Sequence, residues 1–285
     1  MTLFLGTYFS INKSCFNINK CLSNTILIFF KNMMQNKKHS LVKNKIVLNI
    51  LLFLLLTSKP LFSHHKIYSP IVEEGRQSFE WRGHFDVDDR VEKNKAHHHV
   101  LETEYSWTDF WQSELEFHLS DKENTPMDWE KTEFQNQLQI FDYKNWAAAL
   151  YFSYNVVSKS DSADEIEYKY LNEFYNDTFG FISNFIFEKE VGKTAEGSTT
   201  FSISNYLYMK DIFFDLSFGV LGFSEFGKIS DTNTFGNQEH QYGFQFEYEF
   251  KLSDSEIELA LGYLHGLTDA SANHGLLWNF EYEFH

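Results

Sequence analysis

The sequence contains very little cysteine and proline, and both scarcities limit what the chain can be. Both cysteines, Cys15 and Cys21, lie near the N-terminus, so the rest of the chain has no disulfide framework and no thiolate metal site. Only three prolines occur, at positions 60, 70 and 126. Because proline cannot donate to a β-ladder, we place none of them inside a strand.

Acidic residues are absent from residues 1–63, whose only charged side chains are lysines. The whole chain nevertheless has a formal net charge of −16, so the part that follows is strongly acidic. Such an asymmetry is typical of a targeting segment joined to a mature protein. The acidic body would repel phosphates, which excludes nucleic acid as a partner.

The basic segment has the order of a secretory signal peptide. Lysines 37, 38, 43 and 45 precede an apolar run over 46–56, which is followed by Pro60 and a small residue, Ser63. We therefore predict a signal peptide over 33–63, cleaved after Ser63; the alternative is an uncleaved anchor, although the run is too short for a hydrocarbon layer of about 30 Å. Residues 1–32 are interpreted as a non-native extension or an over-extended gene start, and 64–77 as a periplasmic N-terminal segment.

No long hydrophobic run follows residue 63, and the mean hydropathy is −0.37. Aromatic residues still make up 18% of the chain, with 31 phenylalanines and 15 tyrosines. They recur with period two, as in residues 275–285, where Leu276, Trp278, Phe280, Tyr282 and Phe284 alternate with mostly polar residues. Alternation of this kind down a whole chain is the signature of a transmembrane β-barrel, in which polar lumen residues offset the lipid-facing ones.

Twelve alternating segments can be counted in the acidic part. They cover 78–87, 100–107, 111–120, 129–140, 146–157, 166–175, 179–189, 199–209, 212–223, 238–250, 256–265 and 275–285. The connections after the even-numbered segments are short, and those after the odd-numbered segments are longer and more polar. We therefore predict an all-β, transmembrane antiparallel β-barrel over 78–285, of about 12 strands with both termini periplasmic. A soluble sandwich would not explain this parity, and its core would be overfilled by the aromatics.

If the aromatic face contacts lipid, the other face lines the lumen and is mostly acidic. The predicted lumen residues are Glu80, Arg82, His84, Glu102, Glu104, Glu114, Glu116, Glu133, Gln135, Glu167, Lys169, Glu173, Glu188, Asp215, Glu247, Glu249, Glu258, Glu281 and Glu283. Rings of carboxylates favour cations in a pore. The alternative is that these groups hydrogen-bond to one another and close the lumen, because a barrel of this size lies between filled and open barrels.

Three consecutive histidines, 97 to 99, are weak candidates for metal ligands. Neutral imidazoles together with carboxylates can bind zinc, copper or nickel. Because neighbours on a strand point to opposite faces, only His97 and His99 share a side, with Asp86 nearby. We favour a solvated loop edge over a metal site, and no cofactor is predicted.

Enzymatic activity is the less favoured alternative. An outer-membrane lipase would need a serine, a histidine and an acid or amide in reach of one another on the outer wall. Ser183 and His265 are candidates for that wall, but no His-x-Ser-Asn-Gly element is present. The first outer loop could supply an Asp/His cluster for a protease only loosely.

Residues 69–86 contain Pro70, Glu73, Gly75, Arg76 and Arg82 in an order that resembles the first strand of a family of outer-membrane channels. Residues 102–116 and 184–188 fit the same pattern. The family is described as transporter-like and includes proteins linked to meta-pathway phenol degradation. The resemblance implies a passive outer-membrane channel for small molecules, without fixing the solute.

The sequence thus predicts a narrow, cation-leaning channel in a bacterial outer membrane, or else a plugged barrel with a structural or surface-binding role. Its expected partners are outer-membrane lipids and the barrel-assembly machinery, which would recognise the C-terminal strand through Leu276, Trp278, Phe280, Tyr282 and Phe284.

Phe284→Ser is expected to impair membrane insertion far more than deletion of His285. Outer-membrane strands usually end on an aromatic residue, and Phe284 keeps the register of the closing strand whereas His285 lies one residue beyond it. The amount of folded barrel in isolated outer membranes measures the difference. Normal assembly of both variants would show that this strand is not the recognition signal.

Overall fold

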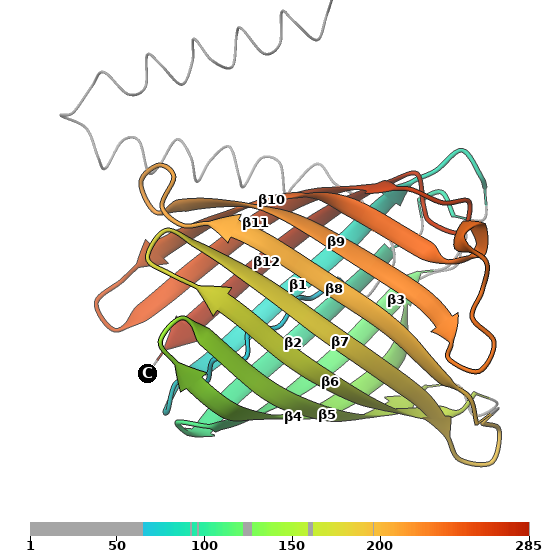
Figure 1. Cartoon of the computed structure of the whole chain (residues 1–285), viewed down its shortest axis with the longest axis horizontal. Helices are drawn as coiled ribbons and strands as arrows, with labels where there is room; N and C mark the ends of the chain where they lie inside the picture. Colours follow the sequence, from blue (N-terminus) through green and yellow to red (C-terminus); the bar gives the residue numbers. More distant parts are fainter. Residues whose placement is uncertain are drawn as a thin grey trace, which may run out of the picture. The chain divides into compact units, whose positions relative to one another are not determined.

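The computed structural model describes residues 65–91, 93–95, 97–121, 127–158, 162–195 and 197–284. These residues form one closed barrel in which each strand pairs with its neighbours along the chain, and the first strand, β1 (Gln77–Val87), pairs with the last, β12 (His274–Phe284) (Figure 1). All pairings are antiparallel. The predicted all-β antiparallel barrel of twelve strands is confirmed. The predicted extension, the signal peptide and His285 lie outside the described residues.

The strands run as follows: β1 Gln77–Val87, β2 His97–Thr108, β3 Trp111–Asp121, β4 Asp128–Tyr143, β5 Trp146–Val157, β6 Asp164–Tyr175, β7 Phe179–Val191, β8 Thr199–Met209, β9 Leu216–Lys228, β10 Glu239–Lys251, β11 Ser255–Gly266 and β12 His274–Phe284. A short 3-10 turn, η1 Phe235–Asn237, precedes β10. Among the described residues, no helix is long and apolar enough to cross a membrane.

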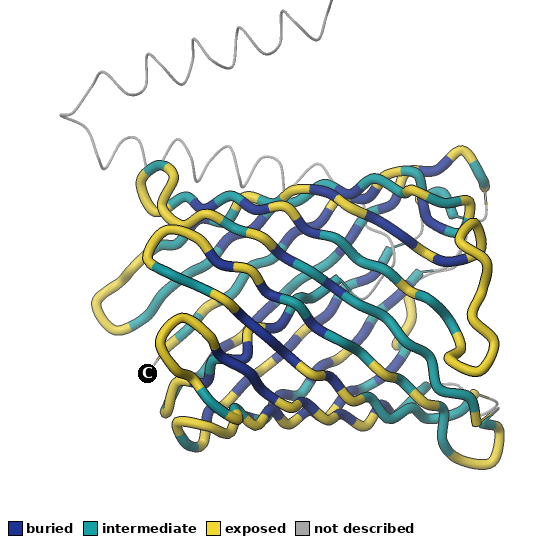
Figure 2. Tube along the Cα trace, viewed as in Figure 1, coloured by how far each residue is buried: buried dark blue, intermediate teal, exposed yellow. Residues whose placement is uncertain are grey.

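Side-chain burial alternates along the strands because successive residues point to opposite faces of the wall (Figure 2). In β2, Leu101 and Tyr105 are exposed on the outer surface, whereas Glu102 and Glu104 are buried inside. This arrangement is the reverse of that in a soluble protein, which buries its apolar side chains. The outer surface is therefore a band of exposed phenylalanine, tyrosine, tryptophan and leucine.

The barrel closes through a full-length ladder between its first and last strands. Partners run without a shift from Gln77 opposite Phe284 to Val87 opposite His274. Closure removes the free edges that a sheet would otherwise present, so every strand has two neighbours. Trp278 of β12 lies over Gly83 of β1 and packs against Trp81 at a ring distance of 6.3 Å, which fastens the outer surface of the seam.

The two ends of the barrel differ in the length of their connections. At the turn end, the strands are joined by residues 109–110, 144–145, 176–178, 210–215 and 252–254; at the loop end, by 88–96, 122–127, 158–163, 192–198, 229–238 and 267–273. The predicted alternation of short and longer connections is present, with one difference. Residues 212–215 were predicted to begin a strand, but Phe214 and Asp215 have φ of 47° and 57° and belong to the turn.

The first loop is fastened to the last one. Asp88 accepts hydrogen bonds from the Arg90 side chain at 2.6 and 2.8 Å and from the backbone of Asn273 at 2.9 Å. These bonds, above all those from Arg90, hold the pKa of the Asp88 carboxyl well below its usual range. Arg90 also donates to the carbonyl of Ser271 at 2.5 Å. The loop end is thereby joined across the β1–β12 seam.

We predict that Gly243→Ala destabilises the barrel by about 1–3 kcal/mol through overpacking. A Cβ on Gly243 would overlap the backbone oxygen of Tyr263 on β11, and backbone in a ladder cannot move aside cheaply. Gly222→Ala is the matched control, because its Cβ would meet nothing nearer than the Gln241 carbonyl at 3.7 Å. Urea unfolding measures both, and equal stability of the two variants would contradict the prediction.

Candidate channel interior

The barrel encloses a cavity of about 1030 Å³ whose lining is mostly polar. Carboxylates outnumber cationic side chains among the residues that line it. Every strand except β5 contributes at least one residue to the lining, because each strand presents alternate residues to the interior. The interior is therefore a cavity whose wall carries more negative than positive side chains.

The structure places the predicted lumen residues on the inner face of the wall. Lining the cavity are Glu80, Arg82, His84, Glu104, Glu114, Glu116, Glu133, Glu167, Lys169, Glu173, Glu188, Asp215, Glu247, Glu249, Glu258, Glu281 and Glu283. Glu102 and Gln135 are buried beside them, at 2% and 1% exposure. Asp215 reaches the cavity from the turn after β8 and not from a strand. That these groups select the solute stays a prediction.

The segment before β1 lies inside the barrel. Within this segment, predicted over 64–77, Lys66 Nζ lies 2.6 Å from Glu102 and 3.1 Å from Glu80, both on the inner wall, and its periplasmic location stays a prediction. Glu114 is 3.8 Å away. Burial opposes the charge of Lys66, but these carboxylates together raise its pKa well above the usual value. A cation from the preceding segment therefore neutralises part of the acidic wall.

Tyr68 is held by both its backbone and its ring. Its N–H donates to Asn184 Oδ1 at 2.8 Å, and its carbonyl accepts from Asn184 Nδ2 at 2.9 Å. Asn184 thus replaces a strand partner for a segment that has none. The Lys169 ammonium lies 3.8 Å from the centre of the Tyr68 ring and 4.0 Å from that of Tyr151. Cation–π contacts of this kind add to the hold on the segment.

Apolar side chains also face the interior, and sequence reasoning missed them. One cluster consists of Ile182, Tyr206, Leu221, Leu264 and Leu277, from five strands, with Ile67 packed against it. A second consists of Tyr68, Ala149, Tyr151 and Leu171. The segment is seated on these clusters, because its apolar residues would otherwise face a polar cavity. The apolar residues within 67–72 were the sequence signal for a segment that packs against the wall, since a solvated linker would be more polar.

The other end of the segment is fastened at the turn end of the barrel. Val72 N–H donates to Gln139 Oε1 at 2.6 Å, and Gly75 N–H donates to the Ser106 carbonyl at 2.9 Å. Arg76 then forms ion pairs with Glu283 at 2.7 Å and with Glu281 at 2.9 Å. The segment therefore passes along the lumen before the chain turns into β1.

Ion pairs are concentrated on one side of the interior. Arg82 contacts Glu80 at 2.8 Å, Glu116 at 2.6 Å and also Glu102, so one guanidinium serves three carboxylates. A planar guanidinium with five donors is suited to this role. On β6, Lys169 pairs with Glu167 at 2.8 Å.

On the wall formed by β9 to β12, Arg76 pairs with Glu281 and Glu283 at the β12 edge, and Glu247 of β10 has different partners. Glu247 accepts from the hydroxyl of Tyr206 at 2.7 Å and from Gln245 at 2.8 Å, both uncharged donors. Glu249 and Glu258 are opposite one another in the β10–β11 ladder. Glu247 is thus bound by uncharged donors, unlike the carboxylates around Arg82.

The three candidate metal residues from the sequence do not come together. His97 and His99 lie on the outer face, where His97 contacts Asp121 at 2.6 Å and His99 accepts from the Trp81 indole at 3.1 Å. Asp86 points inward, with Oδ1 3.0 Å from His84 Nε2. The middle histidine, His98, is the one that faces the interior. Because side chains alternate between the two faces of a strand, the outward-facing His97 and His99 are separated from the inward-facing Asp86.

The lipase pair is also separated. Ser183 is on β7, whereas His265 is on β11 beside His274 at a ring distance of 5.4 Å. These strands are not neighbours in the barrel. The two side chains therefore cannot form a nucleophile–base hydrogen bond in this fold.

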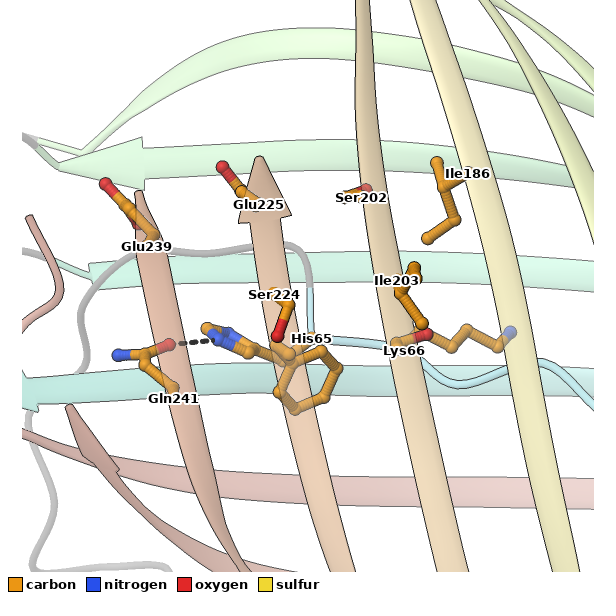
Figure 3. Close-up of a pocket in the computed structure, with 11 residues that line it drawn as sticks. His65, Lys66, Ile186, Ser202, Ile203, Ser224, Glu225, Glu239 and Gln241 are labelled. Atoms are coloured by element: carbon orange, nitrogen blue, oxygen red, sulfur yellow. Dashed lines mark hydrogen bonds between the residues drawn. The ribbon is translucent and has the colours of Figure 1, made fainter. Parts of the chain in front are cut away.

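A small pocket of about 40 Å³ lies where the segment approaches β8, β9 and β10 (Figure 3). His65 Nε2 donates to Gln241 Oε1 at 2.7 Å, and its ring meets that of Phe223 at 4.5 Å. Glu225 and Glu239 are opposite one another in the ladder and line the same pocket. The pocket is only large enough for water, because the His65 side chain occupies most of the space between the segment and the wall.

We expect Asn184→Ala to accelerate hydrogen exchange at the Tyr68 amide by roughly 10–100-fold, because the variant loses two buried hydrogen bonds to the segment. Asn136→Ala is the control: Asn136 accepts from Trp111 and Ser113 at 3.0 and 2.9 Å and has no contact with the segment. Exchange at Tyr68 that is unaffected by Asn184→Ala would show that this side chain does not anchor the segment.

Comparison with known proteins identifies the barrel fold alone. The NanC porin structure superposes with a TM-score of 0.52 at 11% identity, covering 73% of this chain and 99% of that one. An outer-membrane channel from Pseudomonas putida F1 gives a TM-score of 0.51 at 10% identity, covering 79% and 99%. No family model matches the sequence, and no curated protein matches it. The chain thus has the barrel fold of these outer-membrane channels, at sequence identities of 10–11%.

Proposed function

We propose that the protein is a narrow passive channel for small molecules in a bacterial outer membrane, with a lumen that favours cations. The single observation that carries the proposal is the cavity of about 1030 Å³ that remains beside the segment 65–76, in whose lining carboxylates outnumber cationic side chains. Fixed negative charge in a low-dielectric passage attracts cations and repels anions. The channels with the same fold support the assignment.

The same reading includes the orientation and assembly of the barrel. We propose that the turn end faces the periplasm and the loop end faces outward, as in barrels with short periplasmic turns. Both ends of the barrel domain, Gln77 and Phe284, are at the turn end. The β12 aromatics, which include Tyr282 and Phe284 on the outer surface, would be presented to the assembly machinery and then to lipid.

The second candidate function is a plugged barrel, and one observation favours it. The segment 65–76 occupies the lumen and is held by Lys66, Tyr68 and Arg76, which contact β2, β7 and β12. A barrel closed in this way would serve a structural or surface-binding role. The two proposals differ in whether ions pass while the segment stays in place.

Planar-bilayer recording in a potassium chloride gradient separates these proposals. The channel proposal predicts a small, steady conductance with a reversal potential of the sign for potassium. Deletion of residues 65–74 should increase the conductance, because it removes Lys66, Tyr68 and Val72 from the lumen. A silent wild-type protein that conducts only after the deletion would support the plugged barrel. Anion preference would contradict the acidic-lumen argument.

The selectivity should depend on charges inside the barrel. Glu247→Gln combined with Glu258→Gln is expected to lower the potassium-to-chloride permeability ratio, because both carboxylates line the cavity and have few cations nearby. Asp121→Asn removes a carboxylate that contacts His97 on the outer face and should leave the ratio unchanged. An equal change of the permeability ratio in the double variant and in Asp121→Asn would show that the lumen carboxylates do not determine the selectivity.

The solute class is tested with liposome swelling. The resemblance of residues 69–86 to channels of the meta-pathway phenol degradation type leads us to propose small phenolic compounds as the first solutes to compare with sugars. Hydrolysis of phospholipid by the same vesicles tests the enzyme alternative, for which we expect no activity above vesicles without protein.

A further inference from the structure

Two carboxylates and one imidazole converge on the inner wall between β3 and β4. Glu116 and His118 are two residues apart on β3, so both point inward, and Glu133 of β4 is directly opposite Glu116 in the ladder. His118 Nε2 lies 2.7 Å from Glu116 Oε2 and 3.6 Å from Glu133 Oε2. The three side chains are between 0% and 5% exposed. One ligand atom from each lies within 4.8 Å of the others.

The ligand atoms need to approach one another by only a few tenths of an ångström to about 1 Å to hold one metal ion. Ligand atoms bound to one zinc ion at roughly 2 Å each lie no more than about 4 Å apart. We propose that Glu116, His118 and Glu133 bind one divalent transition-metal ion on the inner wall of the barrel. The site lies beyond the channel activity, because binding needs no passage of solute.

The remaining contacts of the three ligands leave the proposed binding atoms turned toward one another. Glu116 Oε1 accepts from Arg82 at 2.6 Å and from the Tyr68 hydroxyl at 3.2 Å, so Oε2 is the oxygen that faces His118. Glu133 Oε1 accepts from the Tyr151 hydroxyl at 3.0 Å, and its Oε2 faces His118 in the same way. Both carboxylates are thus oriented by their other oxygen, as ligands in preorganised sites are.

His98 orients the imidazole from behind. The Nε2 of His98 lies 3.2 Å from the Nδ1 of His118, so one ring donates to the other. A partner on Nδ1 directs the Nε2 lone pair of His118 toward the carboxylates. His98 lies 3.6 Å from Glu130 in turn. His98 is therefore a positioning residue and not a ligand.

The balance of charged side chains around the three ligands favours the binding of a cation. Arg82 and Lys131 lie near the ligands, with Lys131 Nζ 3.8 Å from Glu133 Oε2. Arg82 is also shared with Glu80 and Glu102, and Lys131 with Glu165 at 3.4 Å. The carboxylates around these two cations exceed their charge, so a bound divalent ion adds to a wall that is negative without it.

The ligand set selects among metals. One nitrogen and two carboxylate oxygens suit zinc, cobalt, nickel or copper, whereas calcium and magnesium prefer oxygen alone. The neighbouring group Glu102, Glu104 and Glu114 has oxygen ligands only, and its space is shared with the Lys66 ammonium. We therefore assign the transition-metal site to the group that contains His118.

Titration of the folded mature protein, without an affinity tag, with Co²⁺ tests the proposal through the visible absorption of the bound ion. One equivalent should bind. His118→Gln and Glu133→Gln should each weaken binding by at least the roughly 10–100-fold typical of lost orienting partners, and His98→Gln should weaken it by about 10-fold. His97→Gln, on the outer face, should leave the affinity unchanged.

A second measurement needs no variant. Electron paramagnetic resonance of one equivalent of bound Cu²⁺ should show one coordinated imidazole nitrogen, from His118. Two coordinated nitrogens, absence of stoichiometric Co²⁺ binding, or equal affinity of wild-type and His118→Gln proteins would overturn the proposal. A protein that binds the ion but gives no conductance would overturn the channel proposal and leave this site standing.

Discussion

The ladder between β1 and β12 is the constraint on which the rest of the structure depends. It closes the sheet, so the backbone of every strand has partners on both sides and no edge is left open. Closure also gives the wall an inside and an outside, and period two then assigns each side chain to one of them. A shift of one residue would turn the row of β12 aromatics inward and the carboxylates outward.

The second constraint is the crowding of negative charge within that closed wall. Carboxylates brought together away from bulk water need cations and hydrogen-bond donors, and the wall itself supplies only some of them. Lys66 and Arg76, which come from the segment before β1, supply two more. This explains why the segment lies inside the barrel, with Ile67 and Tyr68 seated on the apolar clusters between the charges.

The interior was accessible to sequence reasoning only as a list of inward-facing residues. Period two placed Glu116, His118 and Glu133 on one face, but nothing in the sequence brought β3 and β4 into the register that puts Glu116 opposite Glu133. The histidine triplet attracted attention to His97 and His99, which share a side, although the side they share is the outer one. The inward member, His98, contacts a histidine twenty residues further along the chain.

The sequence alone determined the architecture, because the alternation of aromatic and acidic residues, the strand count and the connection lengths are local properties. Only the tertiary structure decided the position of residues 65–76, the division of the wall into paired and sparsely paired carboxylates, and the turn at 210–215. The physical reason is that these depend on partners from distant strands. A side chain such as Asn184 becomes an anchor only when Tyr68 lies beside it.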